Sequence, residues 1–231
     1  MWLLRILPHQ RRLDMKELIN AYKIVGYGAK IKTQFFMAAL FLALGILFEI
    51  MSGGTQSTGS FYIVLSGLFL YQMIVSSDIS TLVQSSPYKK KIQCVYPMIA
   101  VMPWVFVTLN IVLLIHYFFA KNSDAAGLQA QCQTLVVLGL CIFIMLVYFG
   151  LAYKLFVTAT VVMIIFVMVI MFATSAVFNS ENAPELTFAG CAIFNYVCTI
   201  GGCLACKGLT ELLYKLELSS YAFRGLIKKK S

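Results

Sequence analysis

Long apolar runs, separated by short polar turns, constrain this chain more than any other feature of its sequence. Most are close to the ~20 residues that an α-helix needs to cross a bilayer. The runs are 35–51, 61–77, one that begins between 94 and 104 and ends near 119, 132–152, 155–178 and 187–206. Hydrophobic residues make up 61% of the 231-residue chain, which is more than a soluble domain of this length can bury away from water. We therefore expect an all-α, polytopic membrane protein with six transmembrane helices.

The basic residues are distributed unevenly over the two faces of such a protein. When the six runs alternate in direction, all 18 lysines and arginines except Lys121 fall on one face. Cytoplasmic loops carry this excess of positive charge. We therefore expect a cell-membrane protein with both termini and the loop 78–94 in the cytoplasm. Its net charge of +9 would then face lipid headgroups and a protein partner rather than nucleic acid.

The segments that flank the six runs have helical patterns of their own. In the N-terminal segment, 1–34, apolar residues recur with the spacing of an amphipathic helix: Met15, Leu18, Ile19, Tyr22 and Val25. This spacing predicts an interfacial helix before the transmembrane domain, 35–206; a charged topogenic leader is the alternative. Leucines in the tail, 207–231, predict a second amphipathic helix with a basic end.

Motifs for catalysis and for metal binding are missing from the sequence. It has no phosphate-binding loop, no serine-hydrolase elbow and no zinc-protease histidine pair. Its two histidines, His9 and His116, are far apart. Cys203 and Cys206 have C-x-x-C spacing, but they fit packing residues within a span better than a redox or metal site. We expect no catalytic residue, no metal ligand and no cofactor in this chain.

Four polar residues lie within the apolar runs and are candidates for a pathway or a gate: Glu49, Gln72, Asn110 and Asn195. Polar groups inside a membrane mark functional sites because hydrocarbon penalises them. Glu49 lies near the end of its run, where snorkelling to the interface is the alternative. For the other three, hydrogen bonds between helices are the alternative. His116 is interpreted as an interfacial residue rather than a proton relay.

Prolines and glycines indicate where the helices could bend. Pro97 and Pro103 each predict a lost helical hydrogen bond and a kink in the third span. The pair Gly201 and Gly202 predicts close helix packing in the sixth span. We expect these four residues to act as hinges.

The loop between the second and third runs holds the most distinctive polar motif. It reads Ser85, Ser86, Pro87, Tyr88, Lys89, Lys90 and Lys91. Three consecutive lysines cannot lie in hydrocarbon, and a proline disfavours helix for the residue before it. The motif predicts a cytoplasmic turn that a partner protein binds.

This motif, together with a basic amphipathic N-terminal helix, six spans and two cytoplasmic ends, resembles the permease subunits of type-2 ATP-binding-cassette (ABC) transporters. In that family the loop forms a short coupling helix that docks into the ATPase subunit, and the N-terminal helix is called the elbow helix. The resemblance implies that Ser86, Pro87, Tyr88 and Lys89 to Lys91 face an ATPase. It also implies a second permease chain, identical or related, and ATP with magnesium bound by the ATPase chains alone.

The resemblance further implies an exporter that does no covalent chemistry. The apolar spans favour an amphiphilic cargo such as a peptide, a lipid or a drug. The sequence departs from many family members in one respect, because the connection 179–186 is too short for their re-entrant external segment. Two other classes stay open, a stand-alone secondary carrier and a non-transport membrane scaffold.

Overall fold

The computed structural model describes residues 19–20, 23, 31–76, 81–178, 184–217 and 219. Regular secondary structure within these residues is helical throughout. The elements are α2 (Ile31–Ser52), α3 (Ser57–Ser76), α4 (Thr81–Ser85), α5 (Lys89–Cys94), α6 (Tyr96–Asn122), α7 (Ala125–Ala152), α8 (Phe156–Phe178) and α9 (Phe188–Leu213). The expected helix at 15–25 lies almost entirely outside the described residues.

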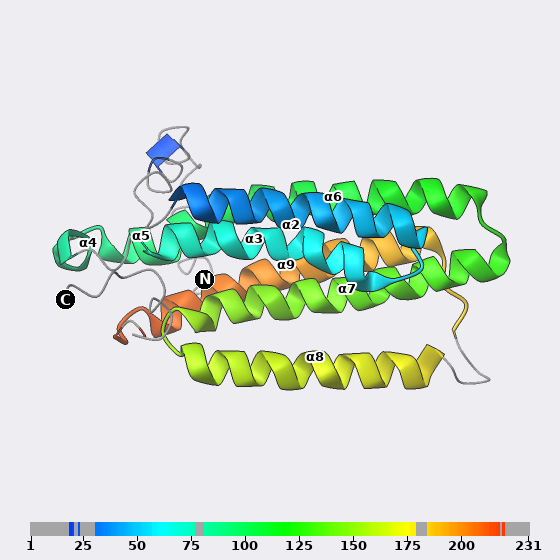
Figure 1. Cartoon of the computed structure of the whole chain (residues 1–231). Coiled ribbons are helices and arrows are strands. Elements are labelled where there is room, and N and C mark those ends of the chain that lie inside the picture. The colour runs from blue at the N-terminus through cyan, green and yellow to red at the C-terminus, as the bar shows by residue number, and fades with distance from the viewer. Residues whose placement is uncertain are drawn as a thin grey trace, which may run out of the picture.

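The long helices lie side by side in an elongated bundle (Figure 1). Its two ends differ in charge. One end, which we call the basic end, holds the short helices α4 and α5, the start of α2 and the end of α9 (Figure 1). The opposite end, which we call the far end, holds the turns at 53–56, 123–124 and 184–187.

Five of the described helical segments are long and apolar enough to cross a membrane: Ile31–Ser52, Lys89–Asn122, Ala125–Ala152, Phe156–Phe178 and Phe188–Leu213. This finding confirms that the chain is an all-helical protein suited to a membrane. The predicted second span corresponds to α3, which has 20 residues and packs along α2.

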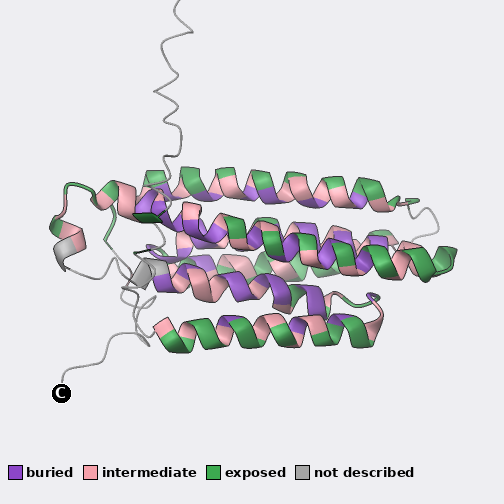
Figure 2. Cartoon of the chain, turned by 90° about the horizontal axis from the view of Figure 1, so that it is seen from above, coloured by how far each residue is buried: buried purple, intermediate pink, exposed green. Residues whose placement is uncertain are grey.

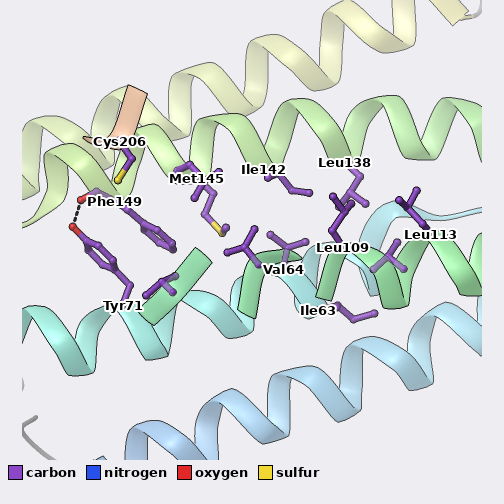
Figure 3. Packing of buried hydrophobic residues seen from close by; sticks show 14 of the residues in the cluster. Ile63, Val64, Tyr71, Leu109, Leu113, Leu138, Ile142, Met145, Phe149 and Cys206 are labelled. Atoms are coloured by element: carbon purple, nitrogen blue, oxygen red, sulfur yellow. Dashed lines mark hydrogen bonds between the residues drawn. The ribbon is translucent and has the colours of Figure 1, made fainter. Parts of the chain in front are cut away.

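A hydrophobic core runs through the middle of the bundle. Its residues come mainly from α3, α6 and α7, and Ile63, Leu109 and Ile142 are fully buried there (Figure 3). α8 lies at the margin beside α7 (Figure 1), and Ala159 is its one buried residue among those described. Seen from above, buried residues gather between the helices and exposed residues on the outer faces of the bundle (Figure 2). Exposed Val, Ile, Met and Phe side chains cover the rest of α8, as expected for a helix with a lipid-facing surface.

The predicted loop at 120–131 is wrong. α6 continues to Asn122 and α7 begins at Ala125, so that only two residues join them. The carboxylate of Asp124 accepts a hydrogen bond from the backbone N–H of Gly127 at 2.8 Å and caps α7. An N-cap of this kind lets a helix begin among polar residues. The polar residues at 120–131 therefore belong mostly to helices and not to a loop.

The third span begins at Tyr96, one residue after α5, which lies within the predicted range of 94 to 104. One other boundary differs from the prediction. The last helix, predicted to end at Cys206, continues to Leu213, so the start of the predicted tail is a direct extension of α9. Lys207 and Glu211 are exposed on this extension. The remainder of the tail lies beyond the described residues, apart from 214–217 and 219.

Candidate functional site

The motif between α3 and α6 forms a helix, a turn and a second helix at the tip of the basic end (Figure 1). α4 ends at Ser85, and the backbone N–H of Lys89 donates to the carbonyl of Ser86 at 3.0 Å across the turn. The side chain of Ser86 accepts from the N–H of Tyr88 at 3.1 Å. Pro87 is exposed, and Tyr88 is 66% exposed although it is aromatic.

The lysines of the motif differ in their surroundings. Lys90 is exposed, and its Nζ lies 5.3 Å from the centre of the Tyr214 ring. Lys91 lies 5.8 Å from the ring centre of Tyr96. Cation–π contacts of this kind are worth about 0.5–1 kcal/mol at exposed sites. The Lys90 contact holds the motif against the end of α9, and Pro87 and Tyr88 stay exposed.

A second polar site lies inside the far end, where α2, α3 and α6 meet. Glu49, in the last turn of α2, places Oε1 2.8 Å from Nε2 of His116 on α6. Ser60, in the first turn of α3, donates its hydroxyl to Oε2 of Glu49 at 2.9 Å. All three side chains are 0% exposed. We call Glu49, Ser60 and His116 the polar cluster.

Glycines make room for the polar cluster. A Cβ atom on Gly59 would lie 2.5 Å from Oε2 and from the backbone nitrogen of Glu49. Gly54, in the turn after α2, has φ +73°, and a Cβ atom there would lie 3.3 Å from Nδ1 of His116. Position 59 therefore requires glycine for space, and position 54 requires it for its backbone conformation, with side chains packed closely around it.

The arrangement of the polar cluster differs from that of a serine-hydrolase triad. In a triad the serine and the carboxylate bind opposite nitrogens of the imidazole ring. Here the hydroxyl of Ser60 lies 3.3 Å from Nε2 of His116, the same nitrogen that faces Glu49. The Ser60 hydroxyl donates to the carboxylate and is fully buried. The cluster is a buried polar contact that joins three helices, and its geometry is not that of an activated nucleophile.

Two interpretations from the sequence are therefore wrong. Glu49 does not snorkel, and His116 is not an interfacial residue, because both are completely buried in the bundle. Their separation in sequence concealed the contact. One signal was present: each is an isolated ionisable residue near the end of an apolar run that borders the same face of the protein.

Two of the other three polar candidates form hydrogen bonds between helices. Nδ2 of Asn195 donates to the carbonyl of Leu135 on α7 at 2.8 Å. Oδ1 of Asn110 accepts from the hydroxyl of Tyr196 at 2.7 Å, which joins α6 to α9. Gln72 is half-buried on α3. None of the three joins the polar cluster, and a role in a pathway stays a prediction for each.

The candidate hinges fall into two groups. Pro97 lies in the first turn of α6, next to the one-residue break at Val95 that separates α5 from α6, and a kink there stays a prediction. Pro103 lies inside α6. Gly202 packs against α7, where a Cβ atom would lie 2.8 Å from the side chain of Leu146, and Gly201 faces Phe143. A hinge role for Pro103, Gly201 and Gly202 stays a prediction.

A groove separates α8 from the bundle on the side of α3. Its apolar part has a volume of about 520 Å³, and Phe61, Leu65 and Met171 are among its lining residues. Towards the far end it meets a polar part that shares Ser57, Thr58, Val137 and Met171 with it. Thr55, Gln133 and Thr174 line that polar part, and no charged residue does.

No group of three or more metal-binding side chains occurs in the part of the chain that the structure describes. Cys206 is buried in the core, and Cys203 packs against it. No family model matches this sequence, and comparisons with curated proteins and with solved structures found no match.

Proposed function

We propose that this chain is the six-span permease subunit of an ATP-driven ABC exporter and forms half of a translocation pathway. The observation that carries this proposal is the exposed turn between α4 and α5. A tip with Pro87 and Tyr88 exposed and followed by lysines is suited to insertion into a groove of another protein. Exposed aromatic residues in a charged setting are common anchors of interfaces.

In this proposal α3 is also a span, which brings the number to six, and the basic end is cytoplasmic. Lys32, Lys89 to Lys91, Lys154 and Lys207 belong to the basic end, whereas Lys121, Asp124 and Glu185 belong to the far end. This distribution supports the positive-inside orientation. The two termini are then cytoplasmic. The turn between α4 and α5 docks on a separate ATPase, which binds ATP and magnesium.

The groove beside α8 supports an amphiphilic cargo. An apolar channel with an uncharged polar mouth matches a molecule that has a hydrophobic tail and a neutral polar group. A second permease chain would complete the pathway, and ATP-driven closure of the ATPase dimer would move the docked turns. Helices transmit such a motion as rigid bodies.

A photo-crosslinking experiment tests the docking proposal. A photoreactive phenylalanine analogue replaces Tyr88 in one variant and Tyr117 in another; both tyrosines are exposed, at opposite ends of the bundle. Irradiation of native membranes is followed by purification and mass spectrometry. We expect an ATPase subunit to crosslink at position 88 and not at position 117. The same yield from both positions, or an ATPase at neither, would contradict docking at the turn.

Charge reversal gives a functional test with a matched control. Lys90→Glu should reduce co-purification of the ATPase, because it removes the positive charge and the contact with Tyr214 at the turn. Lys207→Glu makes the same charge change at an exposed site on α9, at the same end of the bundle. Equal losses in the two variants would indicate a general charge effect rather than docking through the turn.

The polar cluster favours a second candidate, a secondary carrier coupled to protons. Such carriers use buried intramembrane carboxylates, and Glu49 with His116 meets that requirement. Purified chain in proteoliposomes distinguishes the two candidates. A carrier moves cargo in response to a pH gradient without any ATPase, whereas a permease subunit alone does not.

A further inference from the structure

One polar side chain faces outward in the middle of the bundle. Asn110 is exposed and lies near the centre of α6, roughly 20 Å of helix from either end. Among the residues that the structure describes, it is the one exposed polar side chain in the middle third of a long helix. An amide at this depth of a bilayer has no water to bind. Neither docking at the turn nor cargo in the groove beside α8 accounts for it.

Hydrogen bonds within the described chain satisfy only part of this amide. Nδ2 of Asn110 donates to the carbonyl of Phe106 at 2.7 Å, and Oδ1 accepts from the hydroxyl of Tyr196 at 2.7 Å. A carboxamide has two N–H donors, and its oxygen accepts two hydrogen bonds. The described residues therefore leave one N–H and one acceptor site of Asn110 unused. Lipid acyl chains offer neither a donor nor an acceptor, so lipid cannot satisfy them.

Asn110 lies at the centre of a stripe of exposed residues along α6. Spacings of four and three residues alternate along this α6 stripe, which consists of Pro103, Val107, Asn110, Leu114 and Tyr117. The same spacing describes the contact positions of two helices that pack as a left-handed pair. In such pairs a single asparagine among apolar contact positions fixes the register and the number of helices. A hollow of about 460 Å³ beside Asn110 has otherwise apolar walls, formed by Phe106, Val107, Ile111, Leu114 and Ile115.

We propose that a second copy of this chain packs on the α6 stripe, and that the Asn110 side chains of the two copies form hydrogen bonds with each other. Two copies inserted in the same direction meet at equal depth across a twofold axis, so position 110 faces position 110. The unused N–H of each amide donates to the unused acceptor site of the other. This self-complementary pairing satisfies both amides, and it identifies the partner as an identical chain.

The other long exposed faces lack this polar complementarity at their described centres. The exposed stripe of α9 is aliphatic there, with Val197, Ile200 and Leu204, and the exposed centre of α8 is also apolar. Lipid tails are as apolar as these side chains and can cover both faces.

The dimer also leaves the groove beside α8 open to cargo. That groove is lined by residues of α2, α3, α7 and α8, whereas the proposed contact lies on α6. The inference deepens the proposed function, on which it rests for the need of a second permease chain. It names that chain as a copy and assigns its contact surface.

Disulfide crosslinking in native membranes tests which face meets a second copy. Leu114→Cys, one turn from Asn110, is introduced into an otherwise cysteine-free chain. Ile200→Cys on α9 and Phe166→Cys on α8 are the controls, and all three positions are exposed. Mild oxidation should give a crosslinked homodimer from Leu114→Cys and little from the controls. Equal yields from the three positions, or a dimer from a control alone, would overturn the proposal.

Dimerisation of the purified, fluorescently labelled chain in liposomes tests the amide itself. Asn110→Leu should weaken the dimer about 10- to 100-fold, the effect of losing two hydrogen bonds between membrane helices. Thr158→Val also removes an exposed polar group, on α8, and should leave dimerisation unchanged. Tyr196→Phe removes only the hydrogen bond within the chain and should keep the dimer. It thus separates the contact with a second copy from the contact with α9.

Two outcomes in liposomes would contradict the proposal. One is a chain that stays monomeric at every ratio of protein to lipid, and the other is a dimer that Asn110→Leu leaves equally tight. The crosslinking test keeps Asn110 intact, so it applies even if Asn110→Leu does not fold. Both measurements need neither ATPase nor cargo, and their failure would be separate from a failure of docking at Tyr88.

Discussion

The ring of Tyr71 on α3 stacks on the ring of Phe149 on α7, with 4.5 Å between their centres and 7° between their planes. The Tyr71 hydroxyl also donates to the backbone carbonyl of Phe149 (Figure 3). Both side chains are buried. The contact joins two helices of the core through stacking and hydrogen bonding.

Substitutions at Tyr71 should separate these two contributions. Tyr71→Phe keeps the ring and should cost about 0.5–1.5 kcal/mol, the usual net value of a hydrogen bond. Tyr71→Ala also leaves a cavity and should cost about 3–5 kcal/mol, as for other buried aromatic residues. Unfolding in mild detergent measures both losses. Tyr88→Phe, at an exposed position, is the control and should leave stability unchanged.

A methyl group at Gly59 should force α2 and α3 apart. The added Cβ would lie 2.5 Å from a backbone atom of Glu49, and a backbone cannot move aside as a flexible side chain can. We expect Gly59→Ala to destabilise the protein by about 1–3 kcal/mol. Thermal melting of the detergent-solubilised chain measures the change.

Gly208 supplies the matched control for that substitution. It lies on α9, and a Cβ atom there has no neighbour within 4 Å. Gly208→Ala should be neutral or stabilising by up to about 1 kcal/mol, because alanine is the better helix former. If Gly59→Ala proved equally harmless, the close approach of the two helices would be wrong.

Lys154 should hold the end of α9 in place. Its Nζ donates to the carbonyl of Tyr214 at 3.2 Å and also to that of Leu216. A cation at a helix C-terminus satisfies carbonyls that have no partner within the helix. Lys154→Met keeps the apolar stem and removes the donor, so amides in 210–217 should exchange hydrogen faster. Unchanged exchange there would show that the lysine does not secure this segment.

Sidedness labelling should distinguish the two ends of the bundle. Single cysteines at Ser85 and Ser123, in an otherwise cysteine-free chain, lie on exposed positions at opposite ends. In intact cells a membrane-impermeant maleimide should label Ser123→Cys and spare Ser85→Cys. Labelling of both after permeabilisation is the control. The reverse pattern would place the basic end outside and contradict the proposed orientation.

Several features of the fold were predictable because they depend on local properties of the sequence. Apolar runs of membrane-spanning length indicated the helices, and the position of the lysines indicated which helix ends belong together. α8 at Phe156–Phe178 matches its predicted run to within one residue. Boundaries were less predictable, because the cap at Asp124 and the extension of α9 past Cys206 depend on hydrogen bonds and packing rather than hydropathy.

Hydropathy and charge are enough to identify a helical membrane protein whose lysine motif lies between two long helices. The partners of its polar residues, by contrast, became visible only in the folded bundle. Glu49, Ser60 and His116 come from three different helices, and each looks like an isolated polar residue in its own segment. Helical periodicity describes one helix at a time, whereas a contact between helices depends on their packing, rotation and register. The glycine at position 59, which lets α2 and α3 approach, is what brings the carboxylate within reach of the serine.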